Sequence, residues 1–297
     1  MACRLWSGPP EIRQKGYSMK IRCWGARGSI PVSGGDYVTY GGDTTCIEIR
    51  TREDEIIIID AGSGIRRLGN LLIQEKRDHF FMIFTHAHWD HILGFPFFKP
   101  VYRQDTSIQM FGCSAAQESI QAMISRTMEA PYFPVNFQDL QADLSYHNAC
   151  EDDFSIESVT VTPVPISHPN QGFGYKFTEN GKSFVFLTDN ELTFQHPGGL
   201  AFPDYVAFCR GTDLLIHDAE FTEEEYRLTR TWGHTVYKDA LQLALEARVK
   251  TFGLFHHNQE RTDSALEGLL ENCRQIISER GKNLECFALT QQTEIQM

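Results

Sequence analysis

Residues 80–91 read FFMIFTHAHWDH, in which a run of apolar side chains leads directly into four side chains that can bind a metal. The apolar run is typical of a buried β-strand. His86 and His88 alternate along an extended segment and therefore point the same way. Imidazole and carboxylate groups are suitable ligands for zinc, manganese or iron. The stretch therefore predicts a metal site at a strand end, where His86 and His88 bind one ion and Asp90 and His91 bind a neighbouring one.

Each ion needs further ligands from elsewhere in the chain. Candidates follow three other apolar strand patterns, namely His168, Asp189 and His256. Taken singly, a His or Asp after a strand is more often a turn or capping residue. Functional residues of layered α/β folds gather at strand ends, however, and the three occur together with the dense cluster at residues 86–91. Their joint occurrence favours a metal site.

Strand and helix patterns alternate along the chain, which predicts an α/β fold. Apolar, β-branched stretches predict strands at residues 19–24, 46–49, 55–59, 80–84, 158–164, 183–187, 214–216 and 251–255. Apolar residues at three- and four-residue spacing predict helices over 236–247 and 266–277, the latter with Asp263 as N-cap and Gly281 after its last turn. A further helix is predicted over 115–128. The length suits a single domain over residues 19–297, and residues 1–18 form an N-terminal extension to which we assign no role.

The composition argues against several classes of protein. A net charge of -12 and no run of Lys or Arg argue against long nucleic acids as partners. No stretch of about 18 apolar residues is present, which argues against a membrane partner. The eight cysteines are scattered without CxxC pairs, so we expect them to be reduced and mostly buried. These features together predict a cytoplasmic protein.

The metal-binding stretch resembles the HxHxDH signature of the metallo-β-lactamase superfamily, and Asp60 in residues 59–62 matches an earlier strand end of that family. Residues 217–219 (HDA) and 233–235 (GHT) are similar to its phosphodiesterase branch, which includes RNase Z and class II cyclic-nucleotide phosphodiesterases. The resemblance implies an αββα sandwich of two mixed sheets packed face to face, with helices outside and the metals at one sheet edge.

The resemblance also implies roles for individual residues. It implies two divalent metal ions, zinc in the first place, with manganese or iron as alternatives. The implied ligands are His86, His88 and His168 for one ion, Asp90, His91 and His256 for the other, and Asp189 between them. Asp60 would orient the ligand loop. The implied catalytic residues are Asp90, His234 as a proton donor and Asp218 as its partner.

The activity implied is that of a binuclear metal-dependent hydrolase. The favoured substrate is a small phosphodiester, for example a cyclic nucleotide, attacked by a hydroxide that bridges metals about 3.5 to 4 Å apart. Because the same metal pair can polarise a carbonyl, the alternative is a hydrolase of a lactone, thioester or other carboxylic ester. A structural or sensory metal site is a third interpretation, against which the complete ligand set argues. Relatives often dimerise, so a homodimer is also implied.

Several side chains keep two interpretations. Arg27 and Ser29 either contact a phosphate or only form a turn, and His217 is either functional or a satisfied core histidine. His79, His147 and His196 are expected at the surface. Aromatic residues near the metal loop either stack on a nucleobase or belong to the core; they are Phe95, Phe97, Phe98, Tyr132 and Phe133.

Overall fold

The computed structural model describes residues 19–113, 119–150 and 152–297. The expected extension over residues 1–18 lies outside the described residues, as does the beginning of the helix predicted over 115–128. The division into an extension and a single domain over 19–297 stays a prediction.

The strands of the described chain form two mixed sheets, each with seven strands. The first sheet has the order β14-β1-β2-β3-β4-β5-β6, and the second has the order β13-β12-β11-β10-β9-β8-β7. The strands of the first sheet are β1 (Met19–Gly25), β2 (Cys46–Thr51), β3 (Ile56–Ile59), β4 (His79–Ile83), β5 (Ser107–Gly112), β6 (Asp143–Asn148) and β14 (Glu294–Gln296). Those of the second are β7 (Phe154–Ile156), β8 (Val159–Pro165), β9 (Phe173–Glu179), β10 (Lys182–Leu187), β11 (Leu214–Asp218), β12 (Thr251–Phe255) and β13 (Glu285–Ala288).

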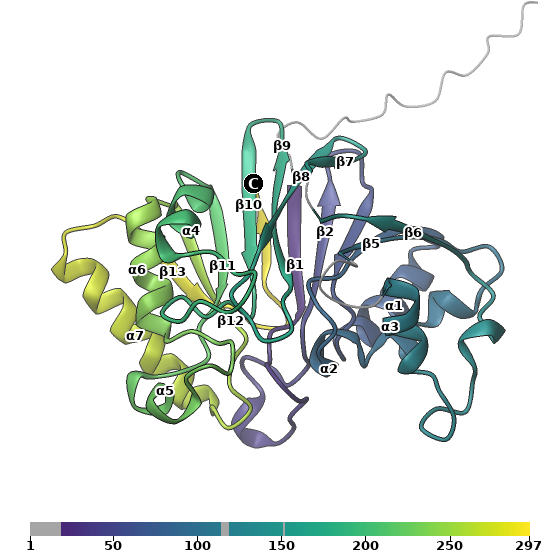
Figure 1. The fold of residues 1–297 in the computed structure, drawn as a ribbon, viewed down its shortest axis with the longest axis horizontal. Helices are drawn as coiled ribbons and strands as arrows, with labels where there is room; N and C mark the ends of the chain where they lie inside the picture. Colours follow the sequence, from purple (N-terminus) through teal and green to yellow (C-terminus); the bar gives the residue numbers. More distant parts are fainter. Residues whose placement is uncertain (1–18, 114–118, 151) are drawn as a thin grey trace, which may run out of the picture.

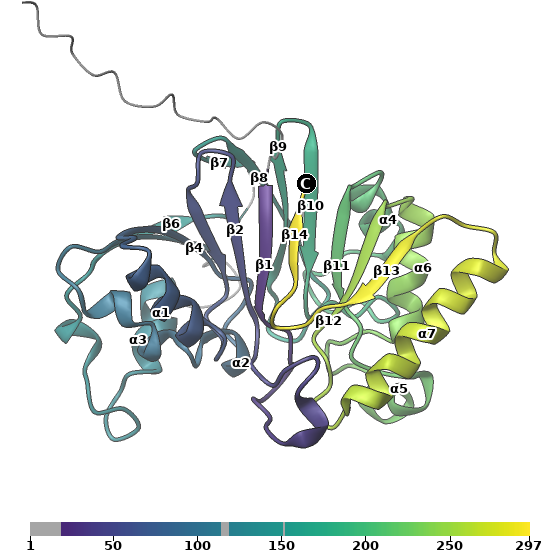
Figure 2. The ribbon, with the colours of Figure 1, turned by 180° about the vertical axis from the view of Figure 1, so that it is seen from behind.

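Helices cover the outer face of each sheet, and the predicted αββα sandwich is thereby confirmed (Figure 1). Figure 2 shows from behind how β14 brings the C-terminus back beside β1. The α-helices are α1 (Ile65–Gln74), α2 (Trp89–Ile92), α3 (Ile120–Arg126), α4 (Phe202–Cys209), α5 (Glu223–Thr229), α6 (Tyr237–Ala247) and α7 (Asp263–Glu279). Short 3-10 helices are η1 (Gly35–Tyr37), η2 (Phe95–Phe97), η3 (Lys99–Tyr102) and η4 (Phe137–Asp139).

The central strands are buried on both faces, which explains their unbroken apolar sequences. In β3, Ile57 and Ile59 belong to the core between the two sheets, whereas Ile56 and Ile58 belong to the core under α1 and α3. All four side chains are almost fully buried. Successive residues of a strand point to opposite faces, so a run of four isoleucines fills two layers at once.

Strand direction brings the candidate metal ligands to one edge of the sandwich. In the first sheet β3 and β4 are parallel, so Asp60 and the metal loop follow them at the same edge. In the second sheet β10, β11 and β12 are parallel, and β8 runs with them because both β8 and β10 pair antiparallel with β9. His168, Asp189 and His256 therefore leave their strands toward the same edge.

The eight predicted strands and the two best-defined helices are all present, with small shifts at their ends. One cap differs from the prediction. The N-cap of α7 is Thr262, whose side chain accepts a hydrogen bond from the amide of Ala265. Asp263 is the first residue of α7 and instead accepts from the amides of Thr39 and Tyr40. Gly281 follows the helix with a φ of 57°, as a left-handed stop requires.

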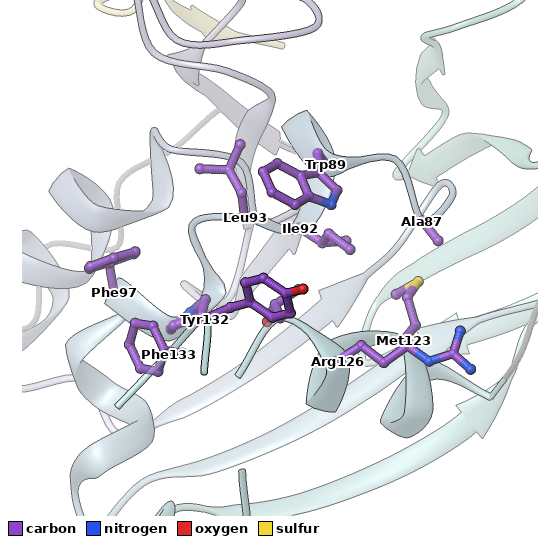
Figure 3. Close-up of a pocket in the computed structure, with 11 residues that line it drawn as sticks. Ala87, Trp89, Ile92, Leu93, Phe97, Met123, Arg126, Tyr132 and Phe133 are labelled. Carbon is purple, nitrogen blue, oxygen red and sulfur yellow. The ribbon is translucent and has the colours of Figure 1, made fainter. Parts of the chain in front are cut away.

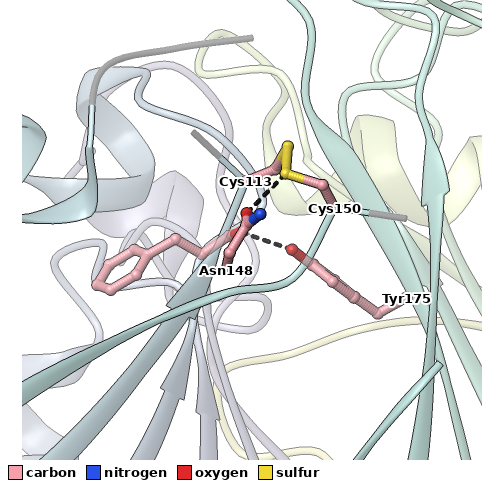
Figure 4. The surroundings of a disulfide bond; sticks show 5 residues. Cys113, Asn148, Cys150 and Tyr175 are labelled. Atoms are coloured by element: carbon pink, nitrogen blue, oxygen red, sulfur yellow. Dashed lines mark hydrogen bonds between the residues drawn. A yellow bond between two sulfur atoms is a disulfide. The ribbon is translucent and has the colours of Figure 1, made fainter. Parts of the chain in front are cut away.

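The expectation that all cysteines are reduced is wrong for one pair. Cys113 and Cys150 form a disulfide between the ends of the parallel neighbours β5 and β6 (Figure 4). Tyr175 lies beside it and donates a hydrogen bond to the carbonyl of Phe84, at the start of the metal loop. The other five cysteines among the described residues are free and buried, as expected, whereas Cys3 lies outside the described residues. The cysteine argument for a cytoplasmic location therefore loses one premise.

Breaking this disulfide is expected to destabilise the protein. The disulfide joins two residues that are 37 positions apart in the sequence. A cross-link of that span lowers the entropy of the unfolded chain by the equivalent of about 4 kcal/mol. Reductant should therefore lower the denaturation midpoint of the wild type and leave that of Cys150→Ser unchanged. Equal midpoints of reduced and oxidised wild type would show that the bond contributes nothing.

Candidate metal centre

Two groups of side chains that can hold a metal lie side by side at the edge where the strands end. The first consists of His86, His88, His168 and Asp189, and the second of Asp90, His91, Asp189 and His256. Within each group all candidate donor atoms lie within 4.8 Å of one another. Asp189 belongs to both groups. The structure therefore brings together every residue that the sequence predicted as a metal ligand.

Asp189 faces imidazoles of both groups. Its Oδ1 lies 3.2 Å from His91 Nε2 and 3.4 Å from His256 Nε2, and its Oδ2 lies 3.4 Å from His86 Nε2. Asp90 Oδ2 completes the second group at 3.0 Å from His256 Nε2. One carboxylate thus lies between two sets of nitrogen donors.

The donor atoms suit divalent metals. Within the described chain, Nε2 of His86 and Nε2 of His91 are buried and have no hydrogen-bond partner. A buried polar atom without a partner carries a large free-energy cost, and metal coordination removes that cost. Nitrogen and oxygen donors are the ligands that zinc, manganese and iron accept. The resemblance seen in the sequence implies divalent ions, and the residues present fit them.

The ring nitrogens that face away from the centre are held by hydrogen bonds. His91 Nδ1 donates to Asp60 Oδ2 at 2.8 Å, and Asp60 also accepts from the amide and the hydroxyl of Thr85. His168 Nδ1 donates to the carbonyl of Gly233 at 2.9 Å. Such partners fix the tautomer and orientation of a metal-binding histidine. Asp60 therefore lies where an orienting residue is expected.

Glu220 is a partner that the sequence analysis missed. It is 3% exposed and accepts a hydrogen bond from His256 Nδ1 at 2.9 Å. It also lies 3.3 Å from His234 Nδ1. A signal was available, because Glu220 comes two residues after Asp218 at a strand end and side chains two apart point the same way.

Carboxylates and imidazoles shift one another's pKa in the absence of metal. Burial lowers the pKa of His86, to about 3. Burial also disfavours the charged form of His91, but Asp189, Asp90 and Asp60 outweigh this effect and raise its pKa well above the usual value. Imidazoles likewise hold the pKa of Asp189 well below its usual value despite its burial. A metal entering the second group would therefore displace a proton from His91.

His234 and Asp218 lie directly beside the two ligand groups. His234 Nδ1 is 2.7 Å from Asp218 Oδ2, and the His234 ring stacks on His256 with centroids 4.6 Å apart. Burial disfavours the imidazolium, but the carboxylates of Glu220 and Asp218 raise the pKa of His234 to about 9. These two residues also form a third group with Asp189 and His256 whose donor atoms lie within 4.8 Å. In the absence of metal, these carboxylates favour the protonated form of His234 at the edge of the centre.

Three residues of the site have left-handed backbone within two residues of the end of a strand. Asp60, Asp189 and His256 have φ values of 60°, 51° and 56°. Positive φ is uncommon for residues other than glycine and concentrates at functional sites. The turn that ends each strand redirects the next side chain toward the centre.

Arg27, Ser29 and His217, which the sequence left with a functional and a structural interpretation, have structural roles. The guanidinium of Arg27 is buried and donates to the carbonyls of Gly41, Asn258 and Arg261, so it does not face a substrate. The amide of Ser29 donates to Asp90 Oδ2 at 2.8 Å and so positions a ligand. His217 is fully buried, with Nδ1 bonded to the carbonyl of Asp218.

His196 is buried, contrary to the expectation of a surface position. Its Nε2 donates to Glu191 at 2.8 Å. Glu191 also accepts from the amides of Thr231 and Gly233, at 2.8 and 2.9 Å. Since the carbonyl of Gly233 accepts from His168, this buried carboxylate holds the loop that carries His234.

The chain from residue 55 to residue 257 matches the model of a protein family described as the beta-lactamase superfamily domain. The chain belongs to the metallo-β-lactamase superfamily. It is a hydrolase of this superfamily, as the HxHxDH resemblance implied. The matched segment begins just before β3 and ends just after β12, so it includes all the residues of both ligand groups.

Relatives and solved structures support this placement. Ribonuclease Z of Porphyromonas gingivalis is 22% identical over 270 residues, which cover 75% of this chain and 85% of the relative. The short form of human tRNase Z has a TM-score of 0.63 at 20% identity and covers 93% of this chain and 98% of its own. A diphosphatase of the PhnP family has a TM-score of 0.66 at 14% identity and covers 94% and 98%.

The expectation that long nucleic acids are not partners is wrong. The chain is related to proteins named Ribonuclease Z, and its fold is shared by a protein named tRNase Z. The expectation rested on the net charge of -12. Net charge describes the whole surface and does not determine the local field at one cleft, so an acidic chain can still bind RNA.

In the part of the chain that is described, no helix is both long and apolar enough to cross a membrane.

Proposed function

We propose that the protein is a binuclear metal-dependent phosphodiesterase. The observation that carries the proposal is the position of His234, whose Nδ1 lies 2.7 Å from Asp218 and 3.3 Å from Glu220, directly beside the two ligand groups. A protonated imidazole at this place can give a proton to the alkoxide that leaves a phosphate. The names of the relatives, Ribonuclease Z and a PhnP-family diphosphatase, support cleavage of a phosphate ester.

Most of the candidate residues would serve to hold the two metal ions. When bound, two divalent ions lower the pKa of a water molecule and neutralise charge on the phosphoryl oxygens. His86, His88 and His168 would hold one ion, Asp90, His91 and His256 the other, and Asp189 would contact both. Zinc is the proposed metal, with manganese and iron as alternatives.

The chain itself supplies the proton for the leaving group. The negative charges of Glu220 and Asp218 raise the pKa of His234 and so favour its protonated form. The proton passes from His234 to the leaving oxygen as the phosphorus–oxygen bond breaks, and the neutral imidazole then takes a proton back from solvent. Asp60, Glu220 and the carbonyl of Gly233 hold the ligand rings in place during these steps.

Turnover of matched substrates by metal-reconstituted protein tests the proposal. The panel holds bis-p-nitrophenyl phosphate, cyclic AMP, a transfer-RNA precursor with a 3′ extension, and a set of lactones. We expect hydrolysis of at least one phosphodiester, abolished by chelator and restored by zinc or manganese. The cyclic nucleotide and the RNA precursor separate a small substrate from a polynucleotide. Turnover of lactones without turnover of any diester would replace this proposal with a carboxylic-ester hydrolase.

A further inference from the structure

A pocket of about 510 Å³ opens beside the metal loop (Figure 3). One wall comes from α2 and η2, with Trp89 and Phe97. The opposite wall comes from α3 and the turn after it, with Met123, Tyr132 and Phe133. The volume lies within the range of roughly 300 to 1,000 Å³ that is typical of small-ligand sites.

The pocket begins within the metal loop itself. Ala87 and Trp89 line it, and these residues alternate along the chain with the candidate ligands His86, His88 and Asp90. The pocket and the metal centre therefore share residues 86–90, so the pocket lies beside the loop that carries the candidate ligands.

Several aromatic side chains that line the pocket are largely exposed to solvent. Trp89 is 79% exposed and Tyr132 is 87% exposed. Phe97 is half-exposed and packs edge-on against Phe133, with ring centroids 5.6 Å apart. Three of the seven large apolar side chains that are most exposed in the described chain line this one pocket. Gathered exposed apolar surface marks a binding site. By contrast, Phe95 and Phe98 are fully buried and belong to the core.

The pocket and the proton donor come from different halves of the chain. The pocket is lined by residues of α2, η2 and α3, whereas His234 comes from the loop between α5 and α6. Figure 1 shows α2 and α3 beside the first sheet and α5 and α6 beside the second. A diester has two ester groups on one phosphorus, and they point in different directions. If one alcohol leaves beside His234, the other ester group is the one available to the pocket.

We propose that this pocket binds a planar ring, that is, a nucleobase or an aryl group, on the part of the substrate that stays bonded to the phosphate. This inference rests on the proposed phosphodiesterase function and adds to it the class of the retained group. Aromatic faces stack on any base or aryl ring and gain little from a small alkyl group. Arg126 is the one charged side chain among those that line the pocket in the described chain, so the lining is mainly apolar and aromatic.

Esters with the same leaving group isolate the contribution of the pocket. Thymidine 5′-(p-nitrophenyl phosphate) and methyl p-nitrophenyl phosphate both release p-nitrophenolate and differ only in the retained group. We expect Trp89→Ala and Tyr132→Ala each to lower kcat/KM for the thymidine ester about 10-fold, because base stacking contributes that much. The methyl ester should lose much less, so that the ratio of the two kcat/KM values changes about 10-fold. Leu228→Ala, which removes an equally exposed apolar side chain from α5 outside the pocket, should change neither ester.

Binding without turnover gives a second readout. Thymidine 5′-monophosphate should quench tryptophan fluorescence of the wild type, and the quench should disappear in Trp89→Phe. Loss of turnover of both esters to the same extent in the variants, or a quench that persists in Trp89→Phe, would overturn the pocket assignment. If the metal-loaded wild type hydrolysed neither ester while the quench was as expected, the phosphodiesterase proposal would fail and the ring-binding pocket would stand.

Cleavage of a transfer-RNA precursor by the same variants distinguishes a nucleotide of an RNA chain from a small nucleotide ester as the occupant of the pocket. Cleavage of a transfer-RNA precursor that falls about 10-fold in Trp89→Ala would place a nucleotide of a polynucleotide in the pocket. Unchanged RNA cleavage, together with the loss on the thymidine ester, would assign the pocket to small nucleotide esters. No difference on either substrate would exclude a nucleobase.

Discussion

Asp189→Ala is expected to remove both metal ions, whereas Asp90→Ala removes only one. Asp189 contacts His91 and His256 through Oδ1 and His86 through Oδ2, so its loss opens both groups. Asp90 contacts only His91 and His256 among the candidate ligands, at 3.3 and 3.0 Å. Turnover should fall about 1,000-fold or more in both variants, because several kcal/mol of charge stabilisation are lost.

Metal content per chain after dialysis distinguishes the two variants. Asp36→Ala, an exposed aspartate in η1, serves as the matched control and should keep two equivalents and full turnover. Circular dichroism would verify that all three variants are folded. Retention of one tightly bound ion in Asp189→Ala would show that this carboxylate is not shared. Full activity of Asp90→Ala with both ions would show that Asp90 is not a ligand.

His234→Ala is expected to impair substrates in proportion to the basicity of their leaving groups. A proton donor contributes about 10² to 10⁴ in rate where the leaving oxygen needs a proton. A nucleoside alkoxide needs one, whereas p-nitrophenolate leaves without one. Cyclic AMP or an RNA precursor should therefore lose most of its turnover, and bis-p-nitrophenyl phosphate should lose little.

Metal content again provides the control, because His234 also lies in the third group of candidate donors with Asp189. The proton-donor role requires that His234→Ala keep two metal equivalents. Loss of an ion would make His234 a ligand. Equal losses on phenolate and alkoxide substrates would exclude the proton-donor role even with both ions bound. Asp218→Asn should show the same dependence on the leaving group, more weakly, since Glu220 still faces His234 Nδ1 at 3.3 Å.

The sequence predicted the centre of the fold better than its edges. The strands found from apolar runs, such as β3 and β4, lie inside the sheets and are buried on both faces. Several missed strands lie at or near sheet edges, where one face or one side meets solvent and the apolar signal is weak. In β6, an edge strand, every residue is exposed or half-exposed. β9 was missed although it is internal, because Lys176 and Thr178 interrupt its apolar pattern.

The candidate site was likewise predicted only where a local sequence pattern marked its residues. The candidate ligands were found because each one follows a strand pattern or lies within the dense cluster after β4. Glu191 and Glu220 were missed because acidic residues are usually exposed, and only tertiary contacts show that these two are buried. The ring-binding pocket combines α2 with the turn after α3, segments about 40 residues apart in the sequence. The aromatic residues were visible in the sequence, but nothing in it showed that Phe97 and Tyr132 are exposed while Phe95 belongs to the core.

The left-handed backbone of Asp60, Asp189 and His256 has a consequence for attempts to engineer this scaffold. Glycine adopts such a conformation without the penalty of about 1 to 2 kcal/mol that other residues incur. Glycine at any of these three positions would remove that strain, and each such change would also delete a functional side chain. Libraries built on this chain should be screened for retained metal as well as for melting temperature, since here the two selections point in opposite directions.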